Sequence, residues 1–188
     1  ELREASERIA LEEYFVLLSA FKLVKGDAQE ARVNRYSVTE RQVAAFEKRF
    51  PFAFTAGQQA AVRAIYDNVT GPVRMNRLLQ GDVGSGKTAV ALTGIYMALA
   101  SGFQAAYLSP TEVLAAQNYA LLQKTFPEYR VGYLAGGSTA KEKRELKAAL
   151  AAGEVDIVCG THAVLQGDVH FKDLAFCVCD EQHRFGVA

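Results

Sequence analysis

Apolar residues recur in two different patterns along the chain. Over residues 1–50 they recur at helical spacing between charged residues, which is typical of amphipathic helices. From residue 51 onward, short and almost wholly apolar runs alternate with amphipathic stretches. Runs of that kind are typical of parallel strands buried on both faces and connected by helices. The pattern therefore predicts a helical linker or arm over residues 1–50, followed by an α/β domain over residues 51–188.

Two helices are expected in the arm. The first has an apolar stripe that consists of Leu11, Phe15, Leu18 and Phe21. The second is expected to begin at Ser37-x-x-Glu40, because in such a capping box the two side chains satisfy free N–H groups at a helix start. Pro51 marks its end.

Short apolar runs give the expected strands of the α/β domain, and turn residues give the ends of its helices. The expected strands are Leu78–Leu79 and residues 105–109, 131–134, 156–159 and 174–179. Helices are expected to begin near Thr55, Ala89, Thr111 and Thr139, and to stop near Gly71, Gly102, Pro127 and Gly153. The first and last of these starts are again capping-box patterns, Thr55-x-x-Gln58 and Thr139-x-x-Glu142.

The loop between the first expected strand of the domain and the helix after it has the strongest chemical pattern. Gly81-x-x-x-x-Gly86-Lys87-Thr88 fits the G-x-x-x-x-G-K-[ST] phosphate-binding loop without a mismatch. Glycines at 84 and 86 allow a tight backbone turn, the Lys87 ammonium suits β- and γ-phosphates, and a threonine hydroxyl can ligate Mg²⁺. A glycine-rich turn beside a lysine is the alternative, but a chance match has odds of about one in a hundred. The predicted nucleotide-binding residues are Gly81, Asp82, Val83, Gly84, Ser85, Gly86, Lys87 and Thr88.

Two adjacent acids, Asp180 and Glu181, end the last apolar run. Ligands of open parallel sheets bind at the carboxyl ends of the strands, where the phosphate loop also lies. Asp180 is therefore expected to hold Mg²⁺ together with Thr88, and Glu181 to polarise the attacking water. A solvated acidic strand end would be the interpretation if the pair stood alone. Lys87, Asp180 and Glu181 form the predicted catalytic set, and Gln182 and His183 are expected to relay the nucleotide state to neighbouring elements.

Charge and cysteine content change this picture only slightly. Lysine plus arginine and aspartate plus glutamate each number 21 among 188 residues, so bulk charge indicates no nucleic-acid surface. Cys159, Cys177 and Cys179 lie in or beside apolar runs and are expected to be buried, reduced thiols, with a metal site at Cys177-x-Cys179 as the alternative. Without a visible signal peptide or membrane-length apolar run, a reducing cytosol is the expected location, with no membrane partner.

Taken together, these segments resemble the first RecA-like motor domain of a superfamily-two helicase. The quoted runs are Gly81 to Thr88, Ser109-Pro-Thr-Glu-Val-Leu-Ala-Ala-Gln117, Gly160-Thr161-His162 and Asp180-Glu-Gln-His183, followed by Arg184-Phe-Gly-Val187. Their amino-acid sequences are similar to those of the RecG family of ATP-dependent branched-DNA helicases. The similarity covers about residues 50–187 and, more loosely, residues 5–18. Transcription-repair coupling translocases are the rival family; they typically have Phe where Ser85 stands and Glu where Gln182 stands.

The resemblance implies an ATP- and Mg²⁺-dependent motor that remodels stalled forks and four-way junctions in recombination and repair. It implies that Gln58 reads adenine, although a glutamine in a capping box is explained equally well as a helix cap. It also implies contacts to DNA phosphates without base readout. The DNA-contact residues that it implies are Pro110, Thr111, Glu112, Gly136, Gly137, Thr161 and His162.

Such motors hydrolyse ATP between two RecA-like domains, and an arginine finger from the second is worth roughly 10³ to 10⁵ in rate. The chain ends soon after Asp180, so it is expected to be a truncated first motor domain that binds nucleotide but hydrolyses it negligibly. The second motor domain and a DNA-binding wedge domain of the same polypeptide are its expected partners. A nucleotide-gated binding module that does not translocate is the alternative of another class, and a kinase-like transferase is a weaker one.

Overall fold

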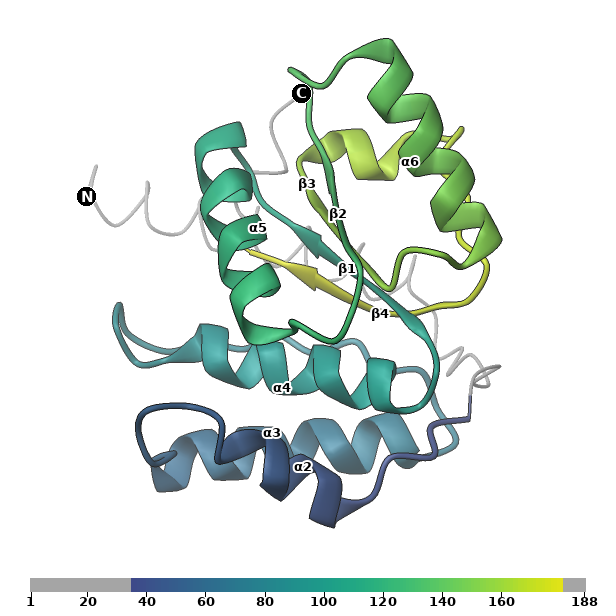
Figure 1. Cartoon of the computed structure of the whole chain (residues 1–188). Coiled ribbons are helices and arrows are strands. Elements are labelled where there is room, and N and C mark those ends of the chain that lie inside the picture. Colours follow the sequence, from purple (N-terminus) through teal and green to yellow (C-terminus); the bar gives the residue numbers. More distant parts are fainter. Residues whose placement is uncertain (1–34, 181–188) are drawn as a thin grey trace, which may run out of the picture. The chain divides into compact units, whose positions relative to one another are not determined.

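A computed structural model of the chain describes residues 35–180, and a parallel sheet forms the centre of this part (Figure 1). The sheet has the order β2-β3-β1-β4. Its strands are β1 (Gln104–Leu108), β2 (Val131–Leu134), β3 (Ile157–Gly160) and β4 (Leu174–Cys179). The α/β fold class predicted from the alternating runs is confirmed. The arm residues before 35, which include the first expected helix, lie outside the described residues.

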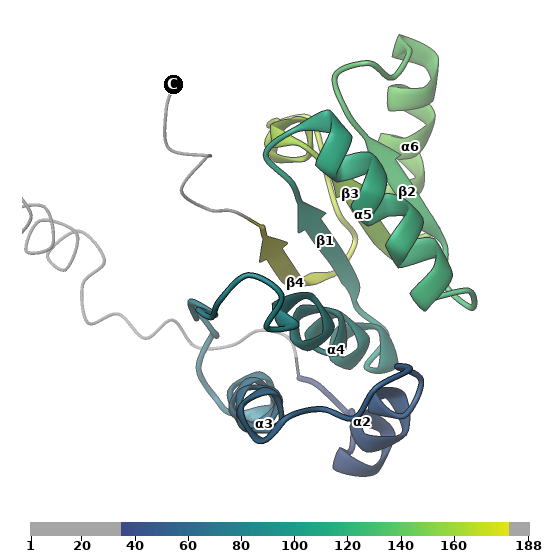
Figure 2. The same cartoon turned by 90° about the vertical axis from the view of Figure 1, so that its left-hand side faces the viewer.

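Helices cover both faces of the sheet (Figure 2). On one face lie α4 (Lys87–Ala100) and α5 (Glu112–Thr125), and α2 (Glu40–Glu47) and α3 (Ala56–Thr70) pack against α4. On the other face lie α6 (Ala140–Ala152) and the short 3₁₀ helix η1 (His162–Leu165). Within residues 35–180, none of the helices is long and apolar enough to cross a membrane.

Alternation along the central strand β1 divides the core into two clusters. Ala105 and Tyr107 face α4 and α5, whereas Ala106 and Leu108 face α6 and η1. All the residues of β1 are buried because the strand has neighbours on both edges and helices on both faces. This arrangement explains why the run is wholly apolar apart from Gln104, whose amide donates to the carbonyl oxygens of Leu150 and Val155.

Two of the three capping boxes expected from sequence are confirmed. Thr55 and Gln58 cap α3, and Thr139 and Glu142 cap α6. In each pair the threonine side chain accepts the backbone N–H three residues on, while the longer side chain accepts the N–H of the threonine. At the other end of α6, Gly153 lies in the left-handed region with φ 75°, where a glycine stop is favourable.

The predicted capping box of the second arm helix is wrong. Helix α2 begins at Glu40, and its capping box consists of Thr39 and Gln42. Ser37 lies outside the helix because its backbone N–H, and that of Val38, donate to the Ser101 hydroxyl at the end of α4. A tertiary contact therefore keeps residues 37–38 extended and delays the helix start.

Helix α2 packs into the same core as the sheet. Phe46 is 1% exposed, and its ring stacks on Tyr96 of α4 at 4.2 Å and on Phe126, beyond α5, at 5.4 Å between centroids. The division of the chain at residue 50 stays a prediction, although the described part of the arm contributes to the domain's core.

The strand expected at Leu78–Leu79 does not form. Residues 75–80 run without strand assignment along a cavity whose opposite wall is β4, and the outer edge of β4 pairs with no other described strand. Strands pair only when their backbones approach to about 4.8 Å, and here the cavity separates the two segments. Leu78 is accordingly 74% exposed.

Only one of the three cysteines is buried, contrary to the sequence expectation. Cys159 is enclosed between β1, β2 and α5, and burial raises the pKa of its thiol to about 12. Cys177 and Cys179 are exposed because they lie on the face of β4 that α6 and η1 leave uncovered. The three thiols are free, and within residues 35–180 no cluster of potential metal ligands occurs.

Candidate functional site

The phosphate-binding loop lies between residues 75–80 and the first turn of α4. Gly84 and Gly86 have φ values of 80° and 77°, which confirms that the turn needs glycine at both positions. The Ser85 backbone N–H donates to the Asp82 carbonyl at 3.1 Å and closes the turn. The start of a 14-residue helix directly follows the loop, so its free N–H groups and positive dipole end face whatever the loop holds.

The Lys87 ammonium is directed back into the loop. It donates to the Gly81 carbonyl at 2.7 Å and to the Asp82 carbonyl at 2.8 Å. Both acceptors are neutral, so an anionic phosphate oxygen in the loop would be the stronger acceptor for the same group. Lys87 is thereby held where a bound phosphate would meet it.

Gln58 both caps α3 and contacts the phosphate-binding loop. Its carbonyl oxygen accepts the Thr55 N–H at 2.8 Å, while its amide nitrogen donates to the Ser85 carbonyl at 2.9 Å. A side chain added at Gly86 would collide with the same amide nitrogen. The cap interpretation is therefore confirmed, and the side chain also ties α3 to the loop; adenine contact stays a prediction.

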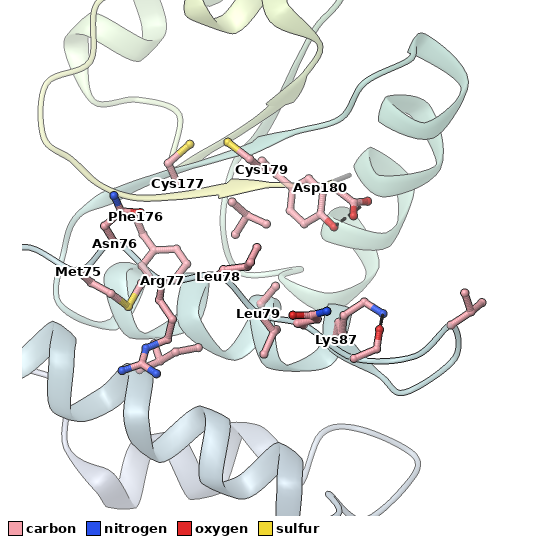
Figure 3. Close-up of a pocket in the computed structure, with 17 residues that line it drawn as sticks. Met75, Asn76, Arg77, Leu78, Leu79, Lys87, Phe176, Cys177, Cys179 and Asp180 are labelled. Carbon is pink, nitrogen blue, oxygen red and sulfur yellow. Dashed lines mark hydrogen bonds between the residues drawn. The ribbon is translucent and has the colours of Figure 1, made fainter. Parts of the chain in front are cut away.

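Asp180 directly follows β4 and is fixed at two points to β1. Its backbone N–H donates to the Leu108 carbonyl at 2.9 Å, and its carboxylate accepts a long hydrogen bond of 3.5 Å from the Tyr107 hydroxyl (Figure 3). Burial, followed by the Asp180 charge, raises the pKa of Tyr107, so the phenol stays a donor. Tyr107 was not predicted from sequence as a site residue, although its place two residues before Ser109 in an alternating strand indicates which face it occupies.

Lys87 and Asp180 line one cavity of about 870 Å³ (Figure 3). Its walls come from residues 75–81 on one side and from β4 on the other, and Tyr107 and Ala91 also line it. Two oxygen ligands that suit Mg²⁺ are available here. The Asp180 carboxylate lines the cavity and is partly exposed, and Thr88, an exposed residue in the first turn of α4 directly after Lys87, carries a hydroxyl but does not itself line the cavity. Hard oxygen ligands of this kind, with room for water and phosphate, fit the cation.

The predicted DNA-contact residues gather at the carboxyl edge of the sheet. Pro110, Thr111 and Glu112 follow β1, the glycine pair at 136–137 follows β2, and Thr161 and His162 follow β3. Because the strands are parallel and neighbouring, these three segments lie at one edge of the sheet. Thr161 is only 4% exposed, and its N–H donates to the Leu134 carbonyl, so its side chain belongs to the core.

Glu181, Gln182 and His183 lie outside the described residues, so their roles stay predictions. Asn118 of α5 was not singled out from sequence, yet its amide donates at 2.9 Å to the buried Ser109 hydroxyl. That bond fixes the end of β1 just before Pro110.

Comparison with known proteins gives a family match over most of the chain. The DEAD/DEAH box helicase family matches residues 55–188. Two curated relatives, both described as ATP-dependent DNA helicase RecG, come from Thermotoga maritima and Bacillus subtilis. The first is 42% identical over 99% of this chain and 24% of its own length, and the second is 41% identical over 99% and 28%. The chain thus spans about a quarter of the length of these relatives.

Solved structures agree with this match. A structure described as RecG bound to a three-way DNA junction is 40% identical, with a TM-score of 0.81, over 100% of this chain and 26% of that chain. An ATP-dependent RNA helicase described as hypothetical, from Sulfolobus tokodaii, is 18% identical with a TM-score of 0.55 over 77% of this chain and 42% of that chain, which shows a shared fold alone. The resemblance to RecG helicases stated from sequence is confirmed.

Proposed function

This chain belongs to the DEAD/DEAH box helicase family, and we propose that it supplies the ATP-binding half of a RecG-type motor that remodels branched DNA. Family membership implies ATP use. The observation that supports the proposal most is the placement of Lys87 and Asp180 on one cavity, at the carboxyl edge of the sheet where the predicted DNA-contact segments also end. Nucleotide and DNA would then act on one rigid set of strand ends.

On the nucleotide side, the loop N–H groups and the α4 dipole bind the β- and γ-phosphates, and Lys87 neutralises charge that develops during transfer. Thr88 and Asp180 would hold Mg²⁺, which would supply positive charge against the phosphates. Tyr107 orients the Asp180 carboxylate by its hydrogen bond. Glu181 follows Asp180 in sequence, which supports the proposal that it orients the attacking water.

On the DNA side, short side chains and backbone N–H groups after β1, β2 and β3 contact the phosphate backbone without reading bases. Pro110, Thr111, His162 and the glycine turn after β2 remain exposed or partly exposed for this role. The zero net charge supports local contacts of this kind instead of a broad basic surface. Gln182 and His183 would report the nucleotide state to these segments.

The finer parts of the proposal concern the whole polypeptide. A second RecA-like domain would complete the ATP site, and a wedge domain would engage the junction. The bacterial relatives that act on DNA support a place in the bacterial cytosol beside the nucleoid. A transcription-repair coupling translocase remains the rival within the same fold, and the RecG relatives at about 40% identity favour the junction motor.

A chimera tests the proposal. This chain would replace the matching segment of the Bacillus subtilis RecG, and ATP-dependent unwinding of a three-way junction would be measured. We expect the chimera to unwind the junction and its Lys87→Ala variant to bind the junction without unwinding it. A chimera that binds both ATP and the junction yet does not unwind would contradict the proposal, as would an active Lys87→Ala variant.

A further inference from the structure

Glu112 is the one acidic side chain among the seven proposed DNA-contact residues. A carboxylate repels phosphates, so at this edge of the sheet it is an unexpected neighbour for a DNA backbone. Its contacts give it another task. Glu112 is the first residue of α5, and its carboxylate reaches across to the turn after β2, where it accepts the Gly137 N–H at 3.0 Å.

The turn after β2 is held from two sides. From α5, Glu112 binds the Gly137 N–H; from α6, the Lys143 ammonium donates to the Gly136 carbonyl at 2.7 Å. The Glu112 backbone is itself tied to β2, because its carbonyl accepts the Tyr133 hydroxyl at 3.3 Å. These contacts link the ends of β1 and β2, which are not neighbours in the sheet because β3 lies between them.

Gly136 leaves the space that the Glu112 carboxylate needs. A Cβ at position 136 would lie 2.5 Å from one carboxylate oxygen, which is closer than real Cβ atoms come. A Cβ at Gly137 would lie 3.5 Å from the other oxygen, an ordinary contact. Neither glycine lies in the left-handed region, so space and not backbone strain distinguishes the two positions.

We propose that Glu112 is a positioning residue and not a DNA ligand. Its carboxylate locks the glycine turn against the first turn of α5, so that the segments after β1 and β2 present their phosphate-binding groups in one fixed arrangement. This inference rests on the proposed DNA contact at the same edge. The carboxylate costs some affinity by repulsion, and the fixed geometry gains more because the turn need not be ordered on binding.

A matched series of variants tests the lock in the Bacillus subtilis RecG chimera, with binding to a three-way junction measured at low and at physiological salt. Glu112→Gln keeps an oxygen acceptor and loses the charge, whereas Glu112→Ala loses both. We expect Glu112→Ala to bind about three- to tenfold more weakly, as for one lost hydrogen bond, and Glu112→Gln to bind at least as tightly as the parent. If Glu112→Ala binds as tightly as Glu112→Gln, the carboxylate only repels DNA and the inference is wrong.

The glycine pair provides an independent route to the same lock. Gly136→Ala should weaken junction binding as much as Glu112→Ala, and the double variant should be no weaker than either single one, because each removes the same contact. Gly167→Ala is the matched control: it lies outside the predicted DNA-contact segments, a Cβ there meets nothing within 4 Å, and the variant should bind like the parent. Additive losses from Gly136→Ala and Glu112→Ala would overturn the lock.

A measurement without DNA separates failure of the lock from failure of the proposed function. In the isolated chain, exchange of the Gly137 amide proton should be slowed in the parent and in Glu112→Gln, and faster in Glu112→Ala and Gly136→Ala. Equal exchange in all four proteins would overturn the inference whatever the DNA result. A different result is the expected exchange pattern in the isolated chain together with a parent chimera that does not bind the junction. That result would confirm the lock as a feature of the turn and would show that the proposed DNA contact is wrong.

Discussion

At the residue scale, two single side chains fix the geometry of the phosphate-binding loop. Gln58 joins the start of α3 to the Ser85 carbonyl, and Lys87 joins the start of α4 to the loop carbonyls. The motif predicted the importance of Lys87 from its spacing alone. The Gln58 contact with the loop was not predictable, because the two residues are 27 positions apart and no local pattern relates them.

Substitution of Gly86 should disturb this loop geometry most. Gly86→Ala should weaken ATP binding roughly tenfold, because a non-glycine residue in the left-handed region costs about 1–2 kcal/mol. The added methyl group would also displace the Gln58 amide. Affinity for a fluorescent ATP analogue measures the effect. Gly57→Ala is the control, since a Cβ there meets nothing within 4 Å; equal losses at both positions would contradict the explanation.

Cys179 should be the reactive thiol of the chain near neutral pH. Interaction with the neighbouring Cys177 thiol lowers the pKa of Cys179 to about 7, and the same interaction raises the pKa of Cys177. Because the thiolate is the nucleophile, the alkylation rate should rise with pH through about 7 and then level off, with Cys159 unreactive in the folded chain. Mass-spectrometric mapping after brief iodoacetamide treatment checks this. Alkylation that rises only above about pH 8.5 would show that the thiol is unperturbed.

At the element scale, sequence predicted the existence of the described α-helices and of the four described strands. It did not predict the 3₁₀ helix η1, and it failed where tertiary contacts decide. The threonine caps of α3 and α6 are local devices, and both were predictable from four consecutive residues. The start of α2 was not, because Ser101, 64 residues away from Ser37, holds the chain extended before it. The segment at residues 78–79 is apolar enough for a strand, but strand formation needs a partner, which sequence periodicity does not reveal.

Substitutions at the two candidate caps of α2 distinguish the predicted helix start from the observed one. Thr39→Ala should lower the free energy of unfolding by about 1 kcal/mol, the usual cost of a lost cap. Ser37→Ala should change it by less than about 0.5 kcal/mol, because only the Ser37 backbone is used. Urea unfolding of both variants measures the difference. A larger loss in Ser37→Ala than in Thr39→Ala would show that the capping box predicted at Ser37 is the correct one.

At the scale of the whole molecule, the alternation of apolar runs and amphipathic stretches was enough to predict the α/β architecture. The loop motif was enough to predict which edge of the sheet carries the site. Parallel strands place all their carboxyl ends at one edge of the sheet. It was therefore predictable that Asp180 and the glycine turn after β2 both lie at that edge. The role of Glu112 was not, since the resemblance grouped it with DNA contacts. Its position opposite Gly137 depends on how the β1–α5 and β2–α6 connections fold together.

The central proposal for this chain is an ATP site made by the loop and Asp180, and titration of the isolated chain with a fluorescent ATP analogue, with and without Mg²⁺, tests it most directly. Lys87→Ala should weaken binding about tenfold or more under both conditions, because a charge-assisted contact to phosphate is lost. Asp180→Asn should weaken binding only when Mg²⁺ is present, since its carboxylate acts through the cation. Unchanged affinity in folded Lys87→Ala, or an Asp180→Asn loss that is the same without Mg²⁺, would contradict the account.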